Sequence, residues 1–296
     1  MKVSKTLYFA IFFALTAIFI TSCDDSTGPT DEGTIPKPPT NLMAASKSYN
    51  SVKLTWTPSV SETDSLFSSY VLTVSGINDF APVTVPATSN WFVFKGLEEG
   101  VEYTFSFQAK NSLGELSSAK EIKWSPATQF TTDWKQLPIR IYESESSYES
   151  GLMVYNTNTF HPTTYKVENG ANWTIGLYTK NDEIAIGSAS KLDYNYGSTP
   201  GTAEIGNIYT GILSLEDTFE SKALDQQSFS AKKIDLKQYS SNIAFVVRYH
   251  EAGSSKWTYA KVFVKYTNGS FLQGTASNRY VELQISHQLV PGIPYA

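Results

Sequence analysis

Apolar and polar positions alternate in short runs along most of the chain. Between residues 51 and 57, Val52, Leu54 and Trp56 alternate with polar residues, so a strand there has one apolar and one polar face. Such runs recur about every ten residues in the first part of the chain, which is typical of a β-sandwich. The predicted strands are 51–57, 69–75, 90–94, 102–109 and 119–124, followed by 137–142, 151–155, 172–178, 183–188, 207–214, 242–249, 258–266 and 279–286.

The pattern predicts an all-β protein with two domains, residues 36–131 and residues 133–296. The length of 296 residues is enough for two domains of ordinary size. Aromatic residues reach 14% and charged residues only 17%, a composition that favours half-buried strands. Residues 231–239 are interpreted as a short helix or a turn. Residues 290–296, with two prolines, are interpreted as a strand ending or a loose terminus.

The first residues have the layout of a secretory signal. Lys2 and Lys5 precede an uncharged run over residues 6–20, which is short for a bilayer span and leads to the single cysteine, Cys23. Residues 20–23, Ile-Thr-Ser-Cys, resemble the lipobox of bacterial lipoproteins. The resemblance implies a signal peptide over residues 1–22, lipidation of Cys23 and a lipid-anchored protein of the bacterial outer membrane, exposed at the cell surface. Residues 23–35, rich in Asp, Gly and Pro, are expected to form an acidic flexible tether.

Several motifs of residues 36–131 fall in the order found in one sandwich family. They are PPTNL (38–42), Trp56, SSYVLTVSG (68–76), GLEEGVEYTF (96–105) and AKNSLGELSS (109–118). This part of the chain resembles the fibronectin type III family, which has an immunoglobulin-like fold. We therefore expect Trp56 at the centre of the sandwich and a tyrosine corner formed by Leu97, Gly100 and Tyr103. The family mostly spaces, displays or binds, and the chain has no Arg-Gly-Asp adhesion tripeptide.

Two stretches of residues 133–296 carry a further resemblance. Residues 172–197, and residues 242–266 followed by RYVELQISHQ (279–288), resemble the HmuY haem-binding lipoproteins. The resemblance implies an all-β fold that captures haem between two axial His or Met side chains. The candidate ligands are His161, His250, His287 and Met153, and the sequence assigns none of them to a ligand position. The alternative interpretation makes all three histidines ordinary surface residues.

The rest of the sequence offers little support for catalysis. GxSxG, HExxH, P-loop and GxGxxG motifs are absent, and three scattered histidines lack the close spacing of a zinc site. Acidic residues are interpreted as solvated loop residues, although two of them at the right separation would suit glycoside hydrolysis. These acids are Glu143, Glu145, Glu149, Asp182 and Glu183. A stacking platform for sugars or haem is an alternative to core packing for Trp134, Tyr194, Tyr196, Trp257 and Tyr259.

These observations lead to one functional expectation with two alternatives. The net charge of −5 without a basic cluster argues against a nucleic-acid partner. We expect a non-enzymatic, lipid-anchored surface protein in which the fibronectin-like domain presents residues 133–296 to an extracellular ligand, either haem, a glycan or a protein. The alternatives are a haem-acquisition lipoprotein and a glycan-active enzyme without a recognisable motif.

Overall fold

The computed structural model describes residues 35–76, 80–168, 172–196, 199–251 and 253–296. Residues 35–296 form one compact unit. Its regular structure consists of strands and short 3-10 helices, so the all-β prediction is confirmed for the described residues. None of these residues belongs to a helix long and apolar enough to cross a membrane. The predicted signal peptide and the lipidation site Cys23 lie outside the described residues.

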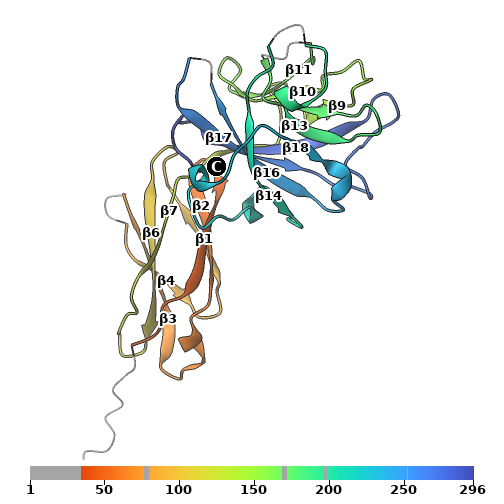
Figure 1. Ribbon diagram of the computed structural model, residues 1–296. Coiled ribbons are helices and arrows are strands. Elements are labelled where there is room, and N and C mark those ends of the chain that lie inside the picture. The colour runs from red at the N-terminus through yellow and green to blue at the C-terminus, as the bar shows by residue number, and fades with distance from the viewer. Residues whose placement is uncertain (1–34, 77–79, 169–171, 197–198, 252) are drawn as a thin grey trace, which may run out of the picture. The chain divides into compact units, whose positions relative to one another are not determined.

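The first part of the chain is a sandwich of two antiparallel sheets, drawn in orange to yellow in Figure 1. One sheet has the order β1-β2-β5 and the other the order β4-β3-β6-β7. The strands are β1 (Thr40–Ser48), β2 (Ser51–Thr57), β3 (Phe67–Ser75), β4 (Val83–Pro86), β5 (Trp91–Lys95), β6 (Tyr103–Asn111) and β7 (Lys120–Trp124), and a short 3-10 helix, η1 (Val60–Thr63), follows β2.

The core of this sandwich has the two features that the sequence predicted. Trp56 is 3% exposed and lies between the two sheets, with ring centroids 5.6 Å from Tyr70 and 4.8 Å from Phe107. The Tyr103 hydroxyl accepts a hydrogen bond of 2.9 Å from the backbone N–H of Glu98, and the neighbouring Leu97 is buried. This bond is the tyrosine corner, which ties the loop before β6 to the core.

The second part, green to blue in Figure 1, contains two further sheets with an apolar core between them. The five-stranded sheet has the order β11-β10-β12-β13-β15, and the six-stranded sheet has the order β14-β16-β17-β18-β8, with β9 also paired to β18. The strands are β8 (Thr128–Phe130), β9 (Ile139–Tyr142), β10 (Gly151–Asn156), β11 (His161–Tyr165), β12 (Ile175–Tyr178), β13 (Ala185–Ser188), β14 (Glu204–Thr210), β15 (Lys233–Asp235), β16 (Ile243–His250), β17 (Trp257–Val264) and β18 (Tyr280–His287). The short 3-10 helices are η3 (Ala189–Lys191), η4 (Leu215–Asp217), η5 (Leu224–Gln226) and η6 (Leu236–Gln238).

Strand β17 is buried on both faces, which explains its nearly continuous run of apolar residues. Ala260, Val262 and Val264 point into the core between the two sheets of the second part. On the opposite face, Phe263 packs against Leu215. A strand covered on both sides loses the polar face of a half-exposed strand.

The two parts of the chain share one apolar cluster. Trp124 of β7 packs against Tyr295, with ring centroids 5.0 Å apart, and Leu224 is fully buried in the same cluster. The backbones of Ala44 and Glu220 exchange two hydrogen bonds of 2.8 and 2.9 Å. The prediction of a loose terminus is therefore wrong, because the last residues of the chain lie against the sandwich, as Figure 1 also shows.

A buried lysine lies where the two parts meet. Lys261 of β17 is fully buried, and its Nζ donates a hydrogen bond of 2.7 Å to the carbonyl oxygen of Thr218. Its ammonium lies 5.1 Å from the centre of the Trp124 ring. Burial lowers the pKa of Lys261 to about 7, because the charged form has lost its contact with water.

Two segment predictions differ from the structure. Residues 128–130 were predicted within the first domain, but β8 pairs with β18 and so belongs to the six-stranded sheet. The link between the domains consequently ends before residue 128 rather than near residue 132. The segment 231–239 contains the short strand β15 and the 3-10 helix η6 instead of one helix or turn. In both cases a three-residue strand is stabilised by a distant partner, which local sequence does not reveal.

Candidate functional site

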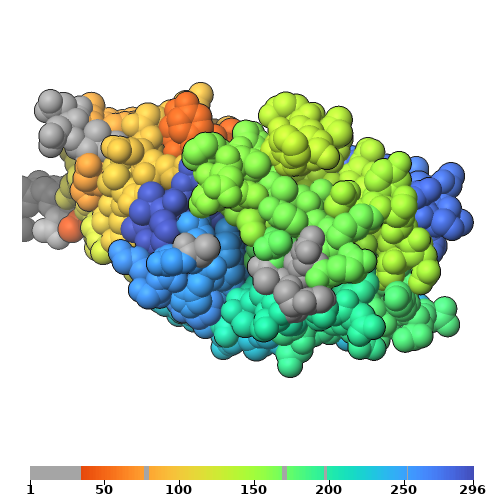
Figure 2. Space-filling view, turned by 90° about the horizontal axis from the view of Figure 1, so that it is seen from above, coloured from red at the N-terminus to blue at the C-terminus, as the bar shows by residue number. Residues whose placement is uncertain are grey.

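A cavity of about 350 Å³ lies in the second part of the chain. It is surrounded by the end of β10 with the turn that follows, by the ends of β11 and β16, and by the segments leading into β12 and β14. In Figure 2, green segments near residues 150–200 adjoin blue segments near residue 250 on this side of the molecule. The lining residues are Met153, Tyr155, Asn156, Thr157, Asn158, Tyr165, Asn172, Trp173, Thr174, Gly201, Thr202, Ala203, Tyr249, His250 and Glu251.

One wall of the cavity is aromatic and is supported by His287 of β18. The rings of Tyr155 and His287 are stacked, with centroids 4.7 Å apart and planes inclined by 18°. The Tyr249 hydroxyl shares a hydrogen bond of 2.7 Å with His287 Nε2. Burial lowers the pKa of His287 to about 3, so the imidazole is neutral at physiological pH. The wall is therefore rigid and uncharged.

Trp173 forms a second aromatic element and depends on two glycines. A Cβ atom on Gly151 or on Gly176 would lie 2.6 Å from the indole ring, so this close packing requires glycine at both positions. The indole is 2% exposed. Its Nε1 is buried and has no hydrogen-bond partner among the described residues.

Amide side chains occupy the rim of the cavity. Asn156 Oδ1 accepts a 2.9 Å hydrogen bond from the backbone N–H of Asn158, the Asx-turn arrangement, and this fixes the loop after β10. Asn156 Nδ2 donates a 2.8 Å bond to the hydroxyl of Tyr165. Asn158 and Asn172 are exposed, so their amides are free to meet a ligand from the solvent side.

Glu251 gives the cavity its charge. It is the one acidic residue among the described residues that line the cavity, and lysine and arginine are absent from that lining. Its Oε1 is buried and inaccessible to water, and the hydroxyl of Thr258 lies nearby. Burial raises the pKa of the Glu251 carboxyl, because the charged form has lost part of its hydration.

The structure separates the candidate haem ligands. Met153 and His250 line the cavity, whereas His161 and His287 do not. His250 is exposed and stacks on Trp257 with ring centroids 3.8 Å apart. His161 is half-buried and meets the Phe130 ring edge-on. The interpretation of His287 as a surface histidine is wrong, because this side chain is fully buried.

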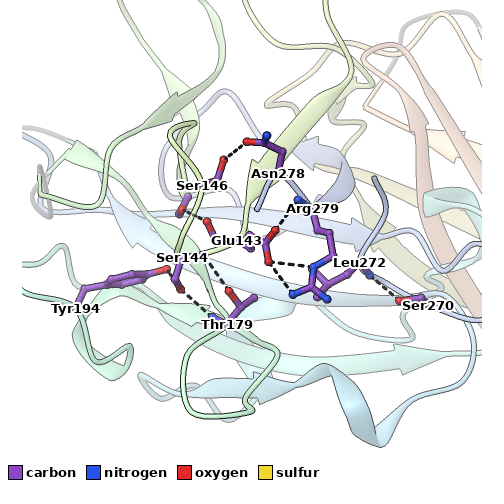
Figure 3. Close-up of polar contacts among 10 residues, drawn as sticks. Glu143, Ser144, Ser146, Thr179, Tyr194, Ser270, Leu272, Asn278 and Arg279 are labelled. Atoms are coloured by element: carbon purple, nitrogen blue, oxygen red, sulfur yellow. Dashed lines mark hydrogen bonds and ion pairs between the residues drawn. The ribbon is translucent and has the colours of Figure 1, made fainter. Parts of the chain in front are cut away.

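The interpretation of Glu143 as a solvated loop acid is also wrong. Glu143 is 4% exposed, and Figure 3 shows its carboxylate beside Arg279. Oε1 accepts the backbone N–H of Arg279 at 2.8 Å, and Oε2 accepts its guanidinium at 2.7 and 3.0 Å. Burial opposes ionisation, but the bonds from Arg279 prevail and hold the pKa of Glu143 below its usual value. This pair joins the loop after β9 to the start of β18, a structural role.

The stacking platform considered as an alternative to core packing does not form as one surface. The hydroxyls of Tyr194 and Tyr196 donate to backbone carbonyls, and both rings pack in a cluster with Trp173. Trp257 packs between Arg248 and His250. Trp134 is the member with a largely open side chain, at 46% exposure.

Comparison with known proteins identifies the first part of the chain. Residues 37–124 match the fibronectin type III domain family. The fibronectin type III domain of the human collagen alpha-1(XX) chain is 24% identical, with 33% of this chain and 92% of that chain covered and a TM-score of 0.28. A Fn3-like protein from Clostridium thermocellum is 23% identical, with 30% of this chain and 92% of that chain covered and a TM-score of 0.25. No curated protein matches the chain.

Proposed function

Because residues 37–124 form a fibronectin type III domain, we propose that this domain is a spacer that presents the cavity of residues 128–296 to an extracellular ligand. The protein is anchored through lipidated Cys23 in the bacterial outer membrane, and it binds its ligand without converting it. The observation that carries this proposal is the cavity with an aromatic wall and one acidic residue, Glu251, in its described lining.

The contacts between the two parts of the chain support the role of a spacer. The shared apolar cluster contains Trp124, Leu224 and Tyr295, and none of the cavity-lining residues belongs to it. The fibronectin domain therefore holds the second part firmly without using the ligand site. The residues that line the cavity support binding without turnover. Glycoside hydrolysis uses two carboxyl groups, and Glu251 is the one carboxyl group among the described lining residues.

Ligand binding is tested by thermal unfolding of the chain without residues 1–22 and with Cys23→Ser, which prevents lipidation. Neutral saccharides, haemin and small amines are added separately. A ligand that binds the folded state raises Tm according to its concentration and Kd. Thr202→Trp fills the cavity and should abolish the shift, whereas Thr210→Trp, on the exposed end of β14, should preserve it. If none of these ligands raises Tm, the proposal is refuted.

The anchor is tested separately in cells. Wild-type protein should incorporate labelled palmitate and fractionate with membranes, and Cys23→Ala should do neither. Because residue 23 precedes the fibronectin domain, the variant should keep the thermal stability of the folded part. Membrane association of Cys23→Ala equal to that of wild type would contradict the lipid anchor.

A second candidate ligand is haem, because Met153 and His250 both line the cavity. Haem iron accepts a His nitrogen or a Met sulfur as an axial ligand. The test is a haemin titration of the same unlipidated chain, recorded over the Soret region. Haem ligation requires a saturable band that is weakened in His250→Ala and Met153→Ala and unchanged in His161→Ala, which alters a histidine outside the cavity.

A further inference from the structure

We infer that the cavity binds a neutral, hydroxyl-rich ring, that is, one or two saccharide units; this inference rests on the proposed function of the same cavity. Four properties of the lining carry the inference: its charge, its polar groups, its aromatic rings and its size. Each one restricts the chemistry of a ligand independently.

The charge of the cavity disfavours anions. Glu251 is the acidic group, and the described lining contains no lysine or arginine to neutralise a phosphate, a sulfate or the propionates of haem. An ionised carboxylate is only an acceptor, so Glu251 in the lining favours a ligand that donates a hydrogen bond. A sugar hydroxyl supplies that donor without bringing a second charge. Bonds from a neutral donor to a charged acceptor contribute more than bonds between neutral groups.

The remaining polar groups suit hydroxyls rather than a cation. Asn158, Asn172, Thr157 and Thr202 are exposed at the rim, and each can both donate and accept. A hydroxyl also donates and accepts, so several adjacent hydroxyls can be satisfied by such a rim. An ammonium group has no acceptor and would leave the amide donors without partners.

The aromatic residues suit the apolar C–H faces of a sugar ring. Tyr155 and Tyr165 are half-buried, so part of each ring remains accessible from the cavity. His287 holds Tyr155 by stacking, and Asn156 holds the Tyr165 hydroxyl. Rings that are fixed before binding lose little conformational entropy when a ligand packs on them.

The volume limits the size of the ligand. About 350 Å³ lies at the small end of the roughly 300–1,000 Å³ found for ligand pockets. One or two sugar rings are of this scale. A porphyrin with two charged propionates is larger and has the wrong charge for this lining.

The inference is tested by calorimetry and saturation-transfer NMR on the unlipidated chain. The neutral probes are glucose, galactose, mannose, N-acetylglucosamine and their common disaccharides. Glucuronate and galacturonate are the anionic counterparts of glucose and galactose. Haemin and ethanolamine represent other classes of ligand. We expect saturable binding of at least one neutral saccharide and at least tenfold weaker binding of the matching uronate. Glu251→Ala should weaken the neutral sugar at least tenfold, and Glu145→Gln, on an exposed loop, should not.

The difference in affinity between a neutral sugar and its uronate shows whether Glu251 contacts the ligand or only stabilises the fold. In Glu251→Gln the gap between a neutral sugar and its uronate should shrink, because the repelling charge is gone while an acceptor oxygen remains. If haemin or ethanolamine binds and no neutral sugar does, the inference about ligand class is overturned and the proposed function stands. If sugar binding is unchanged in both Glu251→Ala and Thr202→Trp, the sugar site lies elsewhere and the inference fails. If no probe binds, the proposed function fails with it.

Discussion

The neutral ring of His287 makes the stability of the protein depend on pH. In the unfolded chain this imidazole has a pKa near 6.5, and in the folded protein burial lowers its pKa to about 3. Between these values the unfolded state binds more protons, so stability is present above pH 6.5 and is lost as the pH falls towards 3. His287→Gln should reduce the pH slope of the unfolding free energy by up to about 1.4 kcal/mol per pH unit in this window.

The measurement is urea unfolding of wild type and His287→Gln at pH values from 7 to 4. Glutamine retains a polar group near the Tyr249 hydroxyl but loses the stacking on Tyr155, so the variant should be less stable than wild type near pH 7 and the difference should narrow as the pH falls. His250→Gln is the matched control on an exposed histidine and should leave the slope unchanged. Equal slopes for wild type and His287→Gln would show that this ring does not remain neutral.

The burial of Trp56 and Tyr103 could be predicted from the sequence, whereas the burial of His287 could not. The reason is physical. Alternation in β18 holds from Tyr280 to Ile285 and then breaks, because Ser286 and His287 are both buried. At that end the strand is covered on both faces, by Tyr155 on one side and by the layer next to the fibronectin domain on the other. Alternation of apolar and polar residues along a strand indicates that one face is buried, but it does not indicate that the other face is also covered. For the same reason Glu251 and Tyr155 were not predicted as a site.

Gly151 is the residue on which the position of Trp173 depends most directly. A Cβ there would lie 2.6 Å from the indole, so Gly151→Ala should lower the unfolding free energy by about 1–3 kcal/mol through overpacking. Urea unfolding measures this loss. Trp173→Phe provides the smaller ring, and the double variant should lose less than the sum of the two single variants. Strict additivity would show that the two residues do not interact.

At the scale of elements, a clear apolar face decides more than strand length what could be predicted, since the nine-residue β1, which lacks regular alternation, was missed along with β4 and β11. The long strands β2, β3 and β6 were expected within two residues of their ends, because each carries an apolar face of its own. The three-residue strands β8 and β15 were missed, since they depend on β18 and β13 as partners. Short edge strands have weak local signals and are defined mainly by pairing.

The last residues of the chain act as an element of the shared core, although they form no strand. Tyr295 is 3% exposed, packs against Trp124, and donates a hydrogen bond of 2.7 Å from its hydroxyl to Glu102. Tyr295→Ala should reduce the unfolding free energy by about 3–5 kcal/mol, as expected for a buried aromatic ring. Tyr295→Phe removes only the hydroxyl bond and should cost about 1 kcal/mol. Thermal or urea unfolding that ranks the two variants equally would contradict the packing role.

At the scale of the whole molecule, the shared cluster predicts that the two parts of the chain unfold together. Leu224 belongs to the second part, is fully buried against the fibronectin domain, and donates its backbone N–H to Pro294 at 2.8 Å. Leu224→Ala should therefore lower the stability of both parts by the same 2–5 kcal/mol or so. Two domains linked by a flexible spacer would instead unfold in two steps.

Hydrogen exchange followed by mass spectrometry distinguishes these cases in the full folded chain. In wild type, the slowest amides of β6 in the first part and of β12 in the second should open with the same free energy. Leu224→Ala should lower both values equally, and Val60→Ala, at a residue that is 71% exposed, should change neither. Loss of protection confined to one part would mean that the cluster joins the parts without coupling them. The fibronectin domain would then be a separable spacer, and a variant such as Tyr295→Ala would leave the cavity residues intact.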